Sequence, residues 1–191
     1  LITILAPPET RHEDIEMIMK DVSGTAGRLD VEIMGGHTEI TDAVNKIVIS
    51  TTVIGKIKKE RLQVIGNIQV GDKLLMTKTA GIEGTSILLN DLESYFKDKM
   101  DMDMIEEGKG YSKYVSVVDE GKISGKYGVN YMHDITEGGV LGAIWEAHKA
   151  IHKGIKVFKD AIPITDITRE LCDILDINPL RLISSGSMLI I

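Results

Sequence analysis

The sequence predicts a mixed α and β fold in two domains. A short apolar strand, an amphipathic helix and further strands occupy the first third, and Gly-opened loops and two helices of regular apolar spacing follow. The chain has 191 residues, of which 43% are hydrophobic and 27% charged. This composition supports a hydrophobic core and excludes an intrinsically disordered chain.

The first strand and helix are predicted from local pattern. Leu1–Ala6 is apolar and ends at Pro7, which cannot donate to a sheet. In Glu9–Val22 the apolar residues follow helical spacing, and Thr10 precedes Glu13 by three residues, as in a capping box. We expect the glycines after residue 22 to end this helix.

Two more strands are expected before the domain boundary. Leu29–Met34 alternates apolar and acidic residues and is followed by the Gly35-Gly36 break. Lys46–Gly55 is rich in Ile, Val and Thr, which favour strands. The charged stretch that follows predicts a boundary, with domains at 1–66 and 67–191.

In the second domain we expect a strand at Lys73–Thr77 and a loop that leads into a short helix over Gly81–Asn90. Helical spacing predicts two further helices, within 140–151 and 164–175. The Met-rich stretch 97–110 and the Gly-containing stretch 119–130 show no clear period and are expected to be loops.

Charge and cysteine content narrow the function classes. With 29 acidic against 22 basic residues and a net charge of −7, the chain is not expected to bind nucleic acid as its main activity. It has no apolar run of the ~18 residues that a membrane-spanning helix requires. The single Cys172 fits a cytoplasmic protein and is expected to be a core residue. Leu1 and the apolar end at 187–191 suggest truncation at both ends.

Gly35-Gly36-His37-Thr38-Glu39 is the first candidate site. Glycines let a backbone approach an anion closely, and the following His, hydroxyl and carboxylate could hold a phosphate or its metal ion. The alternative is a turn that ends a strand and carries a surface histidine.

The second candidate is the stretch from His133 to Gly139, directly before a predicted helix. The first turn of a helix favours phosphate, and Asp134, Thr136 or Glu137 could bind the accompanying cation. The alternative is that Asp134 or Thr136 is the helix cap and Glu137 complements the helix dipole. Local chemistry leaves both interpretations open.

The ordered set of motifs resembles the AIR synthase-related superfamily, which includes aminoimidazole ribonucleotide synthase, HypE, thiamine-monophosphate kinase and selenophosphate synthetase. Within it, the set is most similar to the HypE-like proteins. The resemblance rests on six segments that span nearly the whole chain: Gly35–Thr38, Val53–Gly55, Val70–Leu75, Gly81–Thr85, His133–Val140 and Ser184–Ser187.

The resemblance implies an N-terminal α/β domain that dimerises through its sheet and a C-terminal α+β domain. It also implies ATP and Mg²⁺, phosphate transfer to an oxygen or related nucleophile and, for HypE-like proteins, carbamoyl dehydration on a partner's cysteine in hydrogenase maturation. By the same resemblance, Glu39 and Asp134 are the metal candidates, and the phosphate-binding residues are Gly35, Gly36, His37, Thr38, Asp134, Thr136, Gly138 and Gly139.

The sequence departs from the family pattern in three respects. His37 stands where many relatives carry an acid, and Glu137 stands where many HypE-like chains carry an arginine. An imidazole is a poorer Mg²⁺ ligand than a carboxylate, and loss of an arginine weakens anion binding. The family's Gly-Asp-Asp phosphate segment and HypE's cysteine tail are not in these residues. A non-catalytic homologue that binds a ligand or partner is therefore the alternative hypothesis.

Overall fold

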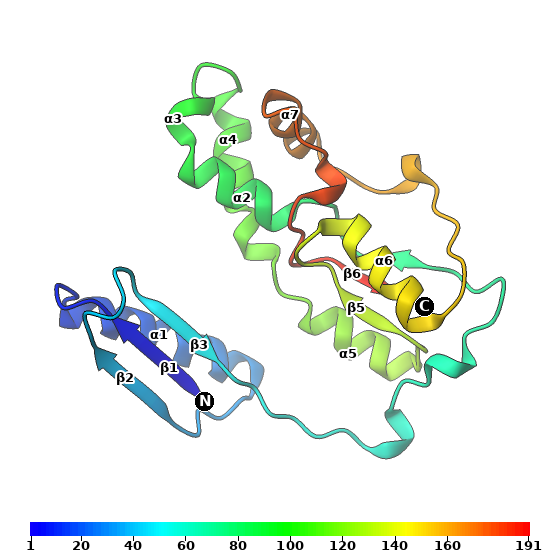
Figure 1. Cartoon of the computed structure of the whole chain (residues 1–191), viewed down its shortest axis with the longest axis horizontal. Helices are drawn as coiled ribbons and strands as arrows, with labels where there is room; N and C mark the ends of the chain where they lie inside the picture. Colours follow the sequence, from blue (N-terminus) through cyan, green and yellow to red (C-terminus); the bar gives the residue numbers. More distant parts are fainter. The chain divides into compact units, whose positions relative to one another are not determined.

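The computed structural model describes residues 1–191, apart from the side chain of residue 61, and contains both helices and strands as predicted (Figure 1). It divides into two compact units, Leu1–Ile57 and Lys58–Ile191, each described here by itself. The predicted domain boundary after residue 66 stays a prediction.

The first unit is a three-stranded sheet with one helix. β1 (Ile2–Ala6) is the central strand, parallel to β2 (Gly36–Ile40) and antiparallel to β3 (Val48–Thr51). Helix α1 (His12–Leu29) connects β1 to β2 and lies along the sheet (Figure 1). Ile4 and Ala6 are fully buried, so the core of this unit lies beneath the central strand.

The helix predicted within Glu9–Val22 is confirmed as α1, but both of its ends differ from the prediction. The helix continues through both glycines expected to end it and stops at Asp30, which has a positive φ of 56°. The cap is also one residue later than predicted, because Arg11 and Asp14, rather than Thr10 and Glu13, form the reciprocal capping contacts.

The strand predicted at Leu29–Met34 was wrong. Its start belongs to α1, and residues 31–35 are irregular. The Gly35-Gly36 pair begins a strand instead of ending one, since Gly36 is the first residue of β2 and pairs with Ile2. The expected strand at 46–55 is confirmed as the shorter β3.

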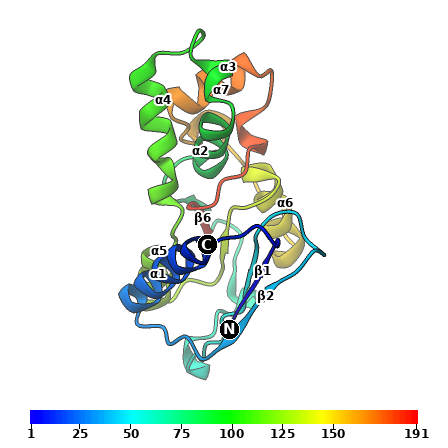
Figure 2. The same cartoon turned by 90° about the vertical axis from the view of Figure 1, so that its left-hand side faces the viewer.

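The second unit joins a helical cluster to a small antiparallel sheet. Helices α2 (Ile82–Asp91), α3 (Glu93–Phe96), α4 (Met102–Lys109) and α7 (Asp166–Ile174) gather at one end, away from the sheet (Figure 2). Their core is built around Leu89, Phe96, Ile105 and Leu171, all fully buried. Cys172 is confirmed as a core residue, and burial raises the pKa of its thiol to about 11.

The sheet has the order β4 (Leu75–Met76), β6 (Met188–Ile190), β5 (Met132–Asp134), with β6 in the centre. Helix α6 (Gly139–Ile151) follows β5, and its Val140 and Ala143 share a core with Ile135 and with Leu189 of β6. The predicted helices at 140–151 and 164–175 are thus confirmed as α6 and α7.

Both segments expected to be loops are in fact helical. The Met-rich stretch forms α4, with Ile105 and Gly108 on its buried side, and the Gly-containing stretch forms α5 (Val118–Tyr127). Short 3-10 turns complete the unit at Lys59–Arg61, Ile65–Asn67, Gly110–Tyr114, Lys159–Ala161 and Pro179–Arg181.

Candidate functional site

The first candidate motif lies on an edge strand. Gly35 accepts a hydrogen bond from the Ile2 N–H through its carbonyl, and a side chain at Gly36 would fall on the Ile2 carbonyl oxygen. Because side chains alternate along a strand, His37 and Glu39 share one face of β2 and Thr38 lies on the other. The glycines therefore bring β2 close to β1, and the polar residues after them are exposed.

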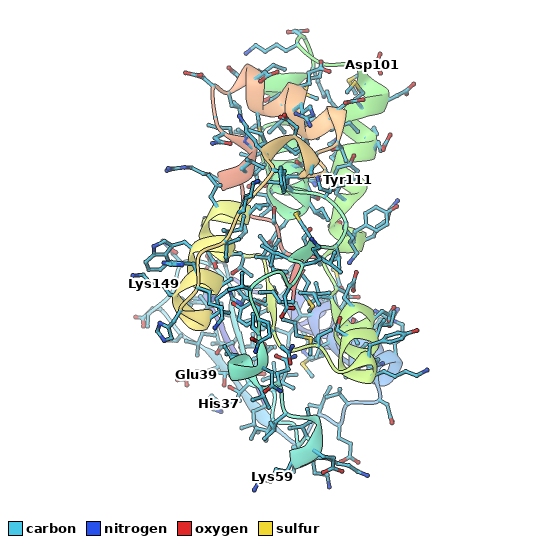
Figure 3. All side chains as sticks on the ribbon, turned by 90° about the vertical axis from the view of Figure 1, so that its right-hand side faces the viewer. His37, Glu39, Lys59, Asp101, Tyr111 and Lys149 are labelled. Carbon is cyan, nitrogen blue, oxygen red and sulfur yellow. The ribbon has the colours of Figure 1, made fainter. Side chains whose placement is uncertain are left out.

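His37 and Glu39 form a pair within this strand (Figure 3). The Nε2 of His37 lies 3.0 Å from Oε2 of Glu39, and both side chains are more than half exposed. The carboxylate that the resemblance offers as a metal ligand is thus already in contact with the histidine that replaces the family's acid.

The second candidate motif is a turn between β5 and α6. Asp134 ends β5 with an exposed side chain, and the main-chain carbonyl of Thr136 accepts a hydrogen bond from the Gly139 N–H at 3.0 Å. Both Gly138 and Gly139 have positive φ angles, 81° and 60°. Left-handed backbone of this kind favours glycine.

The cap predicted as the alternative for this turn is absent. The N-cap residue of α6 is Gly138, which has no side chain to accept a hydrogen bond, so neither Asp134 nor Thr136 caps the helix. Among the described residues, the N–H groups of Val140 and Leu141 donate to no protein acceptor. The first turn of α6 therefore leaves donors free for an anion.

Close packing fixes the position of this turn. A Cβ added to Gly139 would lie 2.6 Å from the Leu182 carbonyl oxygen, 2.7 Å from that of Leu180 and 2.8 Å from the carbonyl carbon of Arg181. All three are main-chain atoms, which cannot rotate away as a side chain can. The backbone of 180–182 thus holds the start of α6 in place.

His133 links the turn to the body of α6. Its Nε2 lies 2.7 Å from Oε2 of Glu146, and its Nδ1 lies 3.6 Å from Oδ1 of Asp134. The sequence analysis did not single out Glu146. The usable signal was its spacing, three residues after Ala143 and six after Val140 on the same helix. The imidazole therefore lies between two carboxylates, one of which belongs to the candidate motif.

Lys78, shortly before the Gly81–Thr85 segment, contacts three other parts of the second unit. Its Nζ donates to the carbonyls of Ser116 and Gly186 at 2.7 and 2.8 Å and lies 2.7 Å from Glu120 of α5. Burial opposes ionisation of Glu120, but hydrogen bonds from Lys78 and the backbone outweigh it and lower the pKa of the carboxyl. Lys78 therefore connects separate segments of the second unit and has a structural role.

The Ser184–Ser187 segment is held by the same stretch. Ser184 Oγ accepts from the Gly81 N–H, and Ser187 Oγ donates to the Thr79 carbonyl at 2.7 Å. Next to this contact, Glu83 in the first turn of α2 has one buried carboxylate oxygen, Oε2, without a partner among the described residues.

The described residues contain neither a ready metal cluster nor a membrane-spanning helix. No group of three or more His, Cys, Asp or Glu side chains there is arranged to hold a metal ion. No helix in the same part of the chain combines the length and hydropathy needed to cross a membrane. The first result leaves the predicted metal role of Glu39 and Asp134 as a prediction.

These motifs and folds are those of a known family. The family described as AIR synthase related protein, C-terminal domain, matches residues 69–191, which is more than half of the chain. The chain therefore belongs to the AIR synthase-related family, as the motifs predicted.

Two curated relatives place the chain among HypE-like proteins. A protein of Methanocaldococcus jannaschii named for hydrogenase expression and formation is 30% identical over 187 residues, which is 98% of this chain and 53% of the relative. The carbamoyl dehydratase HypE of Bradyrhizobium diazoefficiens is 23% identical over 95% of this chain and 51% of its own length. The chain thus spans about half the length of the curated relatives it matches.

Solved structures show the same fold. Escherichia coli HypE superposes with a TM-score of 0.83 at 22% identity, over 99% of this chain and 56% of that one. A HypE in complex with ATP gives 0.76 at 20% identity, over 99% and 55%. The Aquifex aeolicus thiamine monophosphate kinase, complexed with AMPPCP and TMP, gives 0.73 at 18% identity, over 100% and 60%. A HypE in complex with HypF gives 0.70 at 22% identity, over 99% and 60%.

Proposed function

We propose that this chain is part of an ATP-dependent, HypE-like enzyme that activates an oxygen nucleophile by phosphate transfer, as in carbamoyl dehydration during hydrogenase maturation. The support is the family membership together with relatives named for hydrogenase formation and carbamoyl dehydration. Structural neighbours that hold ATP or AMPPCP support the use of a nucleotide.

The observation that carries the proposal is the uncapped first turn of α6. Gly138 and Gly139 adopt positive φ, no side chain caps the helix, and the Val140 and Leu141 N–H groups have no acceptor in the described part of the chain. These donors and the positive end of the helix dipole suit a phosphate group. The residues present therefore fit a nucleotide phosphate at this turn.

The remaining roles follow the resemblance. Asp134 offers an exposed carboxylate for Mg²⁺, and the main-chain carbonyl of Thr136 orders the turn by accepting from the Gly139 N–H. On β2, the proposal assigns phosphate contact to Gly35, Gly36, His37 and Thr38, and metal contact to the carboxylate of Glu39, whose Oε2 contacts His37. When bound, ATP supplies the transferable phosphoryl group, and these residues orient it.

The proposal extends to assembly and location. The chain comprises parts of an N-terminal and a C-terminal domain, divided near residue 66, and the N-terminal sheet forms a homodimer. A protein partner carries the modified cysteine, for which the HypE–HypF neighbour is the structural support. The cytoplasm is the expected compartment, since the single cysteine requires no oxidising environment.

Calorimetric titration with AMPPCP, with and without Mg²⁺, tests the nucleotide site. The Asp134→Asn variant should lose most of the Mg²⁺-dependent part of the affinity, because it removes a negative oxygen ligand and keeps the side-chain size. Asp98→Asn, at an exposed carboxylate in another part of the unit, is the matched control. Equal binding by both variants would remove Asp134 from the site.

A second candidate function is a non-catalytic homologue that binds a ligand or partner. His37 and Glu137 favour it, because each replaces a residue type that assists metal or phosphate binding in relatives. Nucleotide binding without turnover, in a protein that contains this chain and the family's phosphate segment, would support this alternative. Measurable ATP turnover in that protein would eliminate it.

A further inference from the structure

The second unit contains an apolar groove apart from the Asp134–Gly139 turn. The groove has a volume of about 320 Å³ and lies between β4, the buried side of α6 and the segment 156–163. Leu75 and Met76 form one wall, Val157 and Phe158 the opposite wall, and Ile144 belongs to the lining from α6. Leu75 and Phe158 are 60% and 64% exposed, so these walls are only partly covered.

Both walls offer unpaired backbone. Thr77 N–H donates to the Met188 carbonyl, so the alternation of an antiparallel ladder turns the N–H and C=O of Met76 away from β6. In the described residues, neither group has a main-chain partner. The segment 154–158 is irregular, and its N–H groups at 155–157 donate to no acceptor in the described residues.

Four lysines cluster near the wall that carries Phe158. Lys149, Lys153, Lys156 and Lys159 lie within residues 147–159, between Glu146 and Asp160, and of the four only Lys156 lines the groove. Among the described residues, none of these four lysines is in an ion pair. Lys149 projects from the outer side of α6 (Figure 3), and Lys156 lies 4.9 Å from the centre of the Phe158 ring.

We propose that this groove binds an extended peptide segment of a partner protein, with apolar side chains flanked by acidic residues. An extended segment can satisfy the free backbone groups of Met76 and 155–157 by β-strand addition. Its apolar side chains would fill the groove, and its carboxylates would meet the lysines. An apolar groove with one lysine in its lining suits a peptide better than a polynucleotide.

Selection from a displayed library of random decapeptides against this chain tests the proposal. We expect enrichment of sequences that combine acidic residues with alternating apolar ones. One enriched peptide is then titrated by fluorescence anisotropy, where rising ionic strength should weaken binding. Hydrogen exchange should show slower exchange at Met76 and Val157 when that peptide is bound.

Two charge-reversal variants give a matched comparison. Lys156→Glu with Lys159→Glu should weaken peptide binding by about tenfold or more, whereas Lys122→Glu with Lys126→Glu, on the exposed side of α5, should leave it unchanged. Because all four lysines are exposed, neither change should unfold the unit.

Three results would overturn the proposal. The first is an enriched set without acidic residues, and the second is equal loss of binding in both variants. The third is slow exchange at Met76 and Val157 without peptide, because the groove would then already be covered by another part of the protein or a second copy. The Lys156→Glu, Lys159→Glu variant is also titrated with AMPPCP. Loss of peptide binding can then be told apart from loss of the proposed nucleotide site.

Discussion

Gly35-Gly36 and Gly138-Gly139 are identical in sequence but lie in different surroundings. The first pair starts an edge strand, and Gly36 has ordinary strand backbone close to Ile2. In the second pair both glycines have positive φ, and Gly139 is pressed against the main chain of 180–182. A glycine pair thus indicates close backbone approach in both places, but only the second shapes the start of a helix.

The largest effect is expected from Gly139→Ala. The added methyl group meets three main-chain atoms within 2.8 Å at a φ of 60°, so we expect a loss of about 3 kcal/mol in the free energy of unfolding. Chemical denaturation measures this loss. Gly154→Ala, where no atom lies within 4 Å of the new methyl, should change stability by less than about 0.5 kcal/mol. Equal values for the two variants would show that the turn is not constrained.

A smaller and local effect is expected from Gly36→Ala. The methyl group would fall on the Ile2 carbonyl oxygen and force β2 away from β1, at a cost of about 2 kcal/mol. Hydrogen exchange of the β1 amides reports it. Gly27→Ala is the control, because its methyl points into open space within α1 and should stabilise the helix by about 0.5–1 kcal/mol.

The two units also differ in their ion pairs. In the second unit, Glu93 contacts Lys109 and Lys97, and their hydrogen bonds lower the pKa of its carboxyl from 4.5 to about 2. A lowered pKa means that the stabilisation is complete above pH 4.5 and is lost as the pH falls through 2. Glu93→Gln should therefore be less stable than wild type at neutral pH, and the two should converge in acid.

Asp14→Asn is the counterpart in the first unit. Hydrogen bonds from Arg11 lower the pKa of Asp14, but the pair joins residues only three apart in an exposed helix start. Its acid dependence should be weaker than that of Glu93, which connects separate helices. The free energy of unfolding of Asp14→Asn and of Glu93→Gln is measured as a function of pH. A larger acid dependence at Asp14 would contradict the expected difference between the two units.

The smallest effect is expected from the polar residues beside each glycine pair. His37→Ala and Asp134→Ala remove exposed side chains in contact with one neighbour each, so each should change unfolding free energy by about 0.5 kcal/mol or less. Thermal unfolding of both variants checks this. A large loss at either residue would indicate a structural role in place of the proposed binding role.

Local sequence patterns predicted the elements with regular apolar spacing. The apolar stripes of α1 and α6 predicted these helices, and the β-branched runs predicted β1 and β3. Helices α4 and α5 were missed because they are short, at 8 and 10 residues, and both contain glycine, which local rules take as a loop signal. The strand at 29–34 was predicted in error because α1 tolerates glycines at its end.

The contacts that organise the candidate site could not be predicted from local patterns. His133 and Glu146 are 13 residues apart, and Lys78 reaches Gly186 across 108 residues. Such pairs depend on the final packing of α6 and of the 184–187 segment. The residue types of the Asp134–Gly139 turn identified it as a candidate site. The absence of a side-chain cap on α6 could not be predicted, because aspartate and threonine are also typical cap residues.

The central position of β6 affects how the protein folds as it is synthesised. β4 and β5 both pair with β6 alone, and the register Met76↔Leu189 joins residues far apart along the chain. The ribosome makes residues 188–190 after β4, β5 and α6, so the three strands of this sheet can pair only when residues 188–190 emerge. The first unit pairs its strands within residues 2–51 and can fold much earlier. During translation, the apolar residues of β4 and α6 that pack against Leu189 therefore stay without this partner until β6 has been made.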